Sequence, residues 1–349
     1  MRLLLKKLVS TASYYPYEYT LGRLLYRTLV EYGFTVEEQE VGTGRFNLLA
    51  TKNPTKGKSI LFYGHIDTVL PSIKGKDVTA KFKNNRLYGL GALDMKAGLA
   101  AILEATKNTD HYVKILFCVD EEQYSQGAYK ALERKEFFKD VELIISAEPN
   151  FGKGLHSVTT GRLGREVYTV TFTGEPTHII NQDFTDDPIE RLILFMYQFQ
   201  RNNNLLFRDI DTSARIRLIE SKPNGMSTPA KASCEIEVLT GLNEGDLIEK
   251  WEFMFKVKFV PVDRPTPFLK PYFFKDIPHR EKISGIIYAY TKKQMKLTKR
   301  ASVGDDNVLA TLGIPVITWG PDGEGAHTNE EWVDLSSVDT LIEMYKELL

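Results

Sequence analysis

The sequence predicts an α/β fold: a doubly wound, mostly parallel sheet with an inserted α+β unit of ferredoxin-like type. Apolar runs that suit strands buried on both faces occur at residues 60–63, 113–119, 143–147 and 315–319. Helical patterns alternate with these runs, which is typical of sheets covered by helices. The middle of the chain differs, because apolar and polar residues alternate there as on strands with one exposed face.

The first part of the chain begins with an amphipathic helix. From Glu18 to Tyr32 apolar residues recur at helical spacing, and Gly33 is placed to end the helix. Further elements are expected at residues 34–36 and 46–50 (strands), 72–86 (a polar loop) and 96–107 (a helix). The inner face of that second helix is small and apolar, as in a helix that faces a core.

A separate α+β unit is predicted between residues 161 and 261. Its pattern reads strand, helix, strand, strand, helix, strand, which is the order of a split βαβ unit with one helix-free face. Four prolines between positions 261 and 271 indicate the linker that returns to the first domain. We therefore expect one domain formed by residues 1–160 and 262–349, and a lid domain formed by residues 161–261.

The composition is that of an ordinary globular protein. The formal net charge is −1, so no basic field indicates a nucleic acid or an anionic membrane as partner. No apolar run approaches the ~20 residues that span a bilayer, and the first residues are charged too early for a signal peptide. We therefore expect a cytoplasmic protein. Cys118 and Cys234 lie outside any CxxC, so buried free thiols are expected.

Histidines and carboxylates stand where the predicted strands end. Gly64 ends the first buried run, so His65 and Asp67 lie at the edge where open α/β sheets bind ligands. The same pattern recurs at Glu121, Glu122, Glu148 and His327, and Asp94 stands at the head of the helix expected at 96–107. For Asp94 the alternative is a cap at a helix N-terminus, where any carboxylate is favourable. For His65 alone the alternative is a solvated strand end, and the recurrence of the pattern is what favours a shared site.

These residue types indicate a metal site. Two imidazoles and three carboxylates without a thiolate suit Zn²⁺, Co²⁺ or Mn²⁺, and they exceed the needs of one tetrahedral ion. With one bridging carboxylate they form two similar sites, whose ions ~3.5–4 Å apart share a water and polarise a carbonyl. A base must then move the water's proton to the leaving amine. Glu121 and Glu122 point differently in an extended segment, so one can bind metal while the other faces the water.

The motifs resemble, in order, those of the co-catalytic zinc amidohydrolases and exopeptidases, a family that includes acetylornithine deacetylase, succinyl-diaminopimelate desuccinylase, aminoacylase and carboxypeptidase G. The matching stretches are residues 64–69, 89–96, 120–122, 147–149 and 327–330. The resemblance implies two Zn²⁺ ions, with Co²⁺ or Mn²⁺ as alternatives, bridged by Asp94. His65 and Glu148 would complete one site. Glu122 and His327 would complete the other.

The resemblance also implies roles around the metals. Asp67 would orient His65, and Glu121 would be the general base. The peptide bond between Asp94 and Met95 would be cis. The inserted unit resembles the family's lid, which usually forms the interface of a homodimer.

Three residues are expected to contact the substrate. His178 resembles the lid histidine that polarises the scissile carbonyl in the partner subunit's site, the alternative being an exposed loop residue. Arg300 lies in a segment, residues 299–307, that resembles the substrate loop of deacylases in lysine and ornithine biosynthesis, including those that release lysine from an amino-group carrier protein. It would pair with a substrate carboxylate, a solvated basic turn being the alternative. Asn224 resembles the lid asparagine, but its spacing to Pro229 is wider and the arginine that usually ends the next strand is missing.

We therefore expect a dinuclear metal hydrolase that cleaves the amide bond of an N-acyl amino acid. N-acetyl-ornithine, N-acetyl-lysine and carrier-linked lysine are the leading substrates. A metallo-dipeptidase or carboxypeptidase using the same site is the close alternative, although the missing arginine argues against a simple carboxypeptidase-type clamp. A non-catalytic binding module is the rival from another class, and the presence of all the ligands and of Glu121 argues against it.

Overall fold

The structure, a computed structural model, describes residues 1–71, 79–178, 180, 187–206, 212–222, 225–241 and 247–349. It forms two compact units. The first, which we call the α/β unit, comprises Met1–Arg162, Phe273–Arg300 and Gly304–Leu349. The second, which we call the inserted unit, comprises Leu163–Tyr272 and Ala301–Val303.

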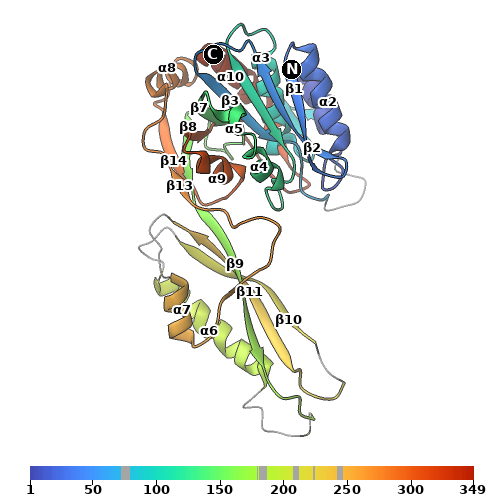
Figure 1. Cartoon of the computed structure of the whole chain (residues 1–349), viewed down its shortest axis with the longest axis vertical. Coiled ribbons are helices and arrows are strands. Elements are labelled where there is room, and N and C mark those ends of the chain that lie inside the picture. Colours follow the sequence, from blue (N-terminus) through green and yellow to red (C-terminus); the bar gives the residue numbers. More distant parts are fainter. Residues whose placement is uncertain (72–78, 179, 181–186, 207–211, 223–224, 242–246) are drawn as a thin grey trace. The chain divides into compact units, whose positions relative to one another are not determined.

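The α/β unit is built on a nine-stranded sheet (Figure 1) of order β1-β2-β6-β3-β7-β15-β8-β13, with β14 paired to β8. Its strands are β1 (Thr35–Gly42), β2 (Arg45–Lys52), β3 (Ser59–His65), β6 (Val113–Cys118), β7 (Val141–Ser146), β8 (Ser157–Arg162), β13 (Tyr272–Phe273), β14 (Lys296–Arg300) and β15 (Val316–Thr318). The central strands β6, β3, β7 and β15 are parallel, as predicted. On the flanks, β1 and β2 pair antiparallel, because the short hairpin that joins them can connect only antiparallel strands.

Both faces of the central strands are covered, which explains their continuous apolar sequence. Every residue of β3 is buried. The Phe62 ring lies 4.9 Å from that of Tyr345 on α10 (Leu335–Leu348). Tyr63, on the opposite face, donates a 2.6 Å hydrogen bond to Asp305 at the start of α9 (Asp305–Leu309). The predicted α/β fold is therefore confirmed.

Both helices predicted for the α/β unit are present close to their predicted positions. The helix expected at 18–32 is α2 (Tyr19–Glu31) and the helix expected at 96–107 is α3 (Ala97–Thr106), which packs beside α10 (Figure 1). A π-helical turn, η1 (Ala92–Lys96), precedes α3. The others are α1 (Arg2–Val9), α4 (Gln126–Ala131), α5 (Lys135–Phe138), α8 (Arg280–Thr291), α9 (Asp305–Leu309), η2 (Ala310–Leu312) and α10 (Leu335–Leu348).

One predicted loop is wrong in part. The polar stretch at 72–86 contains β4 (Lys81–Lys83), and β5 (Arg86–Tyr88) begins at its end; residues 72–78 lie outside the described residues. These strands form a small antiparallel sheet with β16 (Gly323–Glu324) and β17 (Trp332–Asp334). β4 and β5 form a local hairpin whose turn residues Asn84 and Asn85 have positive φ, whereas the pairing of β5 with β17 joins segments far apart in sequence.

The inserted unit has the predicted order of strands and helices. Its elements are β9 (Gly164–Thr173), α6 (Pro188–Leu206), β10 (Ser213–Ser221), β11 (Lys231–Thr240), α7 (Leu247–Phe255) and β12 (Val260–Pro261). The sheet order is β10-β11-β9-β12, and all its pairings are antiparallel. One face packs on the helices through aromatic contacts such as Phe172 of β9 with Phe195 of α6, whose rings lie 5.8 Å apart. The other face is polar, with Arg165 and Arg215 both bonded to Glu237.

Two further expectations concern single features of the chain. Cys118 and Cys234 are buried free thiols, as predicted. In the described part of the chain, no helix is long and apolar enough to cross a membrane.

Candidate metal centre

The site lies at the carboxyl ends of the central parallel strands. The register pairs His65, the last residue of β3, with Cys118, the last residue of β6. Glu121 and Glu122 follow β6, and Glu148 follows β7. Because parallel strands end at the same edge, these side chains meet there without any long-range loop.

Asp94 lies between the two histidines. The His65 Nε2 atom is 3.1 Å from Asp94 Oδ1, and the His327 Nε2 atom is 3.4 Å from Asp94 Oδ2. On the outer side, His65 Nε2 is 3.7 Å from Glu148 Oε1. The His327 Nε2 atom is 3.1 Å from Glu122 Oε1. Each oxygen of one carboxylate thus faces a different imidazole, and each imidazole has a second carboxylate beside it.

Asp94 is not a helix cap. It has non-helical dihedral angles (φ −113°, ψ 96°), and α3 begins only at Ala97, without a side-chain cap. The peptide bond between Asp94 and Met95 is cis, as the family resemblance implied. The capping alternative considered for Asp94 is therefore wrong.

Asp67 orients the site differently from the expectation. The Nδ1 atom of His65 lies 2.9 Å from the backbone carbonyl oxygen of Asp67 and 3.6 Å from its carboxylate. The carboxylate instead accepts hydrogen bonds from the backbone N–H groups of Glu121 (3.2 Å) and Glu122 (3.0 Å). Asp67 therefore holds the turn that carries both glutamates, and its backbone orients the histidine.

Burial and crowding shift the pKa values of these groups. Burial raises the pKa of Glu121 well above its usual value, and the neighbouring carboxylates of Glu148 and Glu122 add to the shift. Hydrogen bonds to Asp94 and Glu122 raise the pKa of His327 to about 10. Although burial opposes it, hydrogen bonds from both histidines lower the pKa of Asp94. The cluster is rich in carboxylates, which draw protons onto the imidazoles, as expected of a site that holds cations.

The donor set fits divalent metal ions. Ligand atoms of His65, Asp94 and Glu122 lie within 4.8 Å of one another, and so do those of His65, Glu121 and Glu148. Imidazole nitrogens and carboxylate oxygens, without thiolates, suit Zn²⁺, Co²⁺ and Mn²⁺. The structure thus brings together the five predicted ligands, with Glu121 beside them.

Of the three predicted substrate residues, the structure describes Arg300 and His178. Arg300 is 5% exposed, so the alternative of a solvated turn is wrong. Its Nη2 atom donates to the Pro149 carbonyl oxygen at 2.6 Å, while Nε and Nη1 have no partner among the residues that the structure describes. His178 lies in the inserted unit and is exposed there. Asn224 lies outside the described residues.

Sequence reasoning missed three supporting residues: Arg162, Asp306 and Glu331. The Arg162 guanidinium lies 3.0 Å from both Glu148 Oε2 and Asp306 Oδ2, so it fixes the outer carboxylate of one half-site. Glu331 accepts backbone hydrogen bonds from the Asp94 segment. Their partners are remote in sequence, so no spacing could have revealed them.

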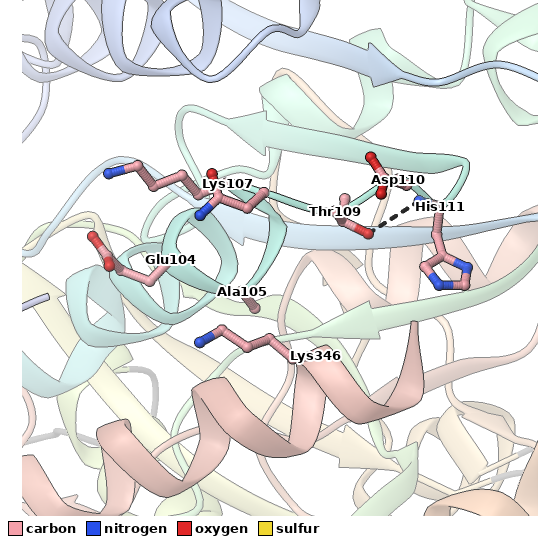
Figure 2. A pocket seen from close by; sticks show the side chains of 8 residues that line it. Glu104, Ala105, Lys107, Thr109, Asp110, His111 and Lys346 are labelled. Atoms are coloured by element: carbon pink, nitrogen blue, oxygen red, sulfur yellow. Dashed lines mark hydrogen bonds between the residues drawn. The ribbon is translucent and has the colours of Figure 1, made fainter.

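A cavity of about 520 Å³ lies elsewhere in the α/β unit (Figure 2). It is lined by the end of α3, by residues that follow it, among them Asp110 and His111, and by Lys346 of α10. Because β6 starts at Val113 and the candidate site lies beyond its other end, this cavity is at the opposite edge of the sheet. None of the candidate ligands lines it.

Comparisons with known proteins identify the family. Residues 61–349 match the model of peptidase family M20/M25/M40. The chain belongs to this family. It is 26% identical to succinyl-diaminopimelate desuccinylase of Blochmanniella pennsylvanica, covering 99% of this chain and 96% of the relative. It is also 26% identical to a candidate LysW-lysine/LysW-ornithine hydrolase of Pyrococcus furiosus, covering 99% and 95%.

Solved structures of the M20/M25/M40 family support the fold. A tripeptidase from Staphylococcus aureus superposes with a TM-score of 0.82 at 19% identity, covering 99% of this chain and 96% of the other. The predicted family is confirmed, and the protein is a metal-dependent amidohydrolase that acts on amide bonds.

Proposed function

We propose that this amidohydrolase is dinuclear and releases an amino acid from an N-acyl group. The observation that carries the proposal is the position of Asp94, whose two oxygens face different histidines. His65 and Glu148 would complete one metal site with Asp94. Glu122 and His327 would complete the other. When bound, two such ions supply an activated water and polarise the scissile carbonyl.

Glu121 is the proposed general base. It shares its turn with Glu122, and the Asp67 carboxylate holds the backbone of both residues. Glu122 is directed to His327, whereas Glu121 lies with His65 and Glu148. Glu121 therefore takes the proton of the attacking water and delivers it to the leaving amine.

Arg300 is the proposed anchor for a substrate carboxylate. Its guanidinium is fixed by the carbonyl oxygen of Pro149, the residue next to Glu148, and keeps buried N–H groups unused among the described residues. A carboxylate would satisfy them with charge-assisted hydrogen bonds. N-acetyl-ornithine, N-acetyl-lysine and carrier-linked lysine carry a suitable amide, and the names of the relatives, a desuccinylase and a LysW-linked hydrolase, favour this class over dipeptides.

The inserted unit is the proposed lid and homodimer interface. Strand β10 is at an edge of its sheet, where an unpaired strand can add to that of a second copy. Apolar side chains are exposed on this strand, including Ile219 (57%), and on α6, including Ile193 and Tyr197. In such a dimer His178 would act in the partner's site.

The glutamate roles can be separated by substitution. Glu121→Gln keeps the size of the side chain but removes the proton acceptor, so turnover should fall by at least ~10²–10⁴-fold with metal content unchanged. Glu122→Gln should instead weaken metal binding. Turnover of N-acyl amino acids and metal content by mass spectrometry measure both. Wild-type turnover by Glu121→Gln, or loss of metal from it rather than from Glu122→Gln, would reverse the assignment.

The role of Arg300 can be tested with matched substrates. Arg300→Met removes charge-assisted hydrogen bonds worth ~1.5–3 kcal/mol each, so kcat/KM for N-acetyl-ornithine should fall at least about tenfold. The fall should be far smaller for its carboxamide analogue, which lacks the carboxylate. Lys299→Met, next to it on the surface, is the control. An equal loss on both substrates would show that Arg300 does not bind the carboxylate.

The dimer predicts a molar mass near twice the 39.8 kDa of one chain, measured by light scattering after gel filtration. Ile219→Lys places a charge at the exposed β10 edge and should give monomers. Phe253→Lys, at an 87% exposed position on α7, should leave the dimer intact. A monomeric wild-type protein would contradict this interface.

A further inference from the structure

A buried carboxylate, Glu331, is bonded to the backbone around Asp94. Its side chain is 1% exposed. The Oε1 atom accepts hydrogen bonds from the N–H groups of Leu93 (2.8 Å) and Asp94 (3.0 Å), and Oε2 accepts one from Gly91 (3.0 Å). One side chain thus holds three backbone N–H groups of the segment that carries the central carboxylate.

Glu331 also connects this segment to the other end of the chain. It lies between His327 and β17, and its own carbonyl oxygen accepts a 3.1 Å hydrogen bond from the N–H of Gly89. Through Glu331, the segment that carries Asp94 and the segment that carries His327 are therefore fixed to each other.

Burial raises the pKa of Glu331 to about 7, although its backbone N–H donors oppose the shift. Lys96 is fully buried, and its ammonium group attracts Glu331 electrostatically while donating to the Thr11 carbonyl oxygen at 2.8 Å. The ammonium group and the N–H donors thus offset part of the cost of burying the carboxylate. A neutral side chain would leave the Lys96 charge without this compensation.

The segment is closely packed where it passes Thr68. Gly91 has a positive φ of +73°, and a Cβ added there would lie 2.5 Å from Thr68 Cγ2. Packing at Gly91 and the hydrogen bonds to Glu331 thus both restrain the segment that leads to Asp94.

We infer that Glu331 is a positioning residue, which fixes the Asp94 backbone and its distance from His327 before any metal binds. This inference rests on the proposed metal site. Outer partners that orient metal ligands typically change metal affinity by ~10–100-fold when they are mutated. Glu331 differs from the usual outer partner because it orients its ligand through the main chain rather than through the ligand's side chain.

The test is the affinity of the full-length protein for Zn²⁺, measured by competition with a chromophoric chelator. Glu331→Gln keeps the shape of the side chain. Its amide nitrogen is a hydrogen-bond donor, however, and must face at least one backbone N–H group, which is also a donor. We expect the dissociation constant to rise ~10–100-fold, and excess Zn²⁺ to restore activity. Glu330→Gln, at the exposed neighbouring position, should bind Zn²⁺ like the wild type.

Three outcomes overturn the inference, and they separate it from the proposed function. Wild-type affinity in a folded Glu331→Gln variant would overturn the inference alone. Failure of the wild type to bind Zn²⁺ stoichiometrically would overturn the metal site and the inference with it. A measurement on the metal-free wild type remains decisive even if the variant does not fold. The amides of Gly91, Leu93 and Asp94 should stay protected from hydrogen exchange, and rapid exchange there would contradict positioning by Glu331.

Discussion

The position of the Asp94 carboxylate between two imidazoles is the constraint on which the rest of the site depends. A buried carboxylate is tolerated only where opposite charge and donors surround it. In this protein His65 and His327 flank it, and each histidine faces a further carboxylate on its outer side. The excess of carboxylates draws protons onto these histidines, so the cluster is electrostatically suited to divalent ions.

The fold produces this arrangement with little irregular structure. Three of the predicted ligands, His65, Glu122 and Glu148, lie at or just beyond the ends of central strands. Parallel pairing of these strands places them side by side. Asp94 and His327 come from segments outside those strands and need separate support. Their backbones are linked by Glu331, while Arg162 braces the opposite half of the site through Glu148. The predicted ligands are thus positioned partly by the strand ends and partly by buried charged residues.

The part of the site that could be predicted from sequence is the part governed by local pattern. His65 and Glu148 each follow an apolar run that predicts a buried strand. Both residues could therefore be placed at the carboxyl-end edge of the predicted sheet. The contacts of Asp67 could not be predicted, because its carboxylate bonds to a turn set by Asp120, which adopts a positive φ of +74°.

Features that depend on contacts beyond the local sequence pattern were not predicted. The burial of Arg300 depends on strand β14 lying beside β8, a pairing between segments far apart in the chain. The small sheet of β4, β5, β16 and β17 was missed because its strands are too short to show a period. The inserted unit was predicted well because each of its strands alternates and its helices are amphipathic, which are local signals.

The proposed metal centre is defined by the number and position of the bound ions. Anomalous scattering at the zinc edge, from crystals of the Zn²⁺-loaded protein, would locate them. We predict two peaks ~3.5–4 Å apart, with Asp94 bonded to both, His65 and Glu148 on one, and Glu122 and His327 on the other. A single peak, or a second ion that Asp94 does not contact, would contradict the proposed centre.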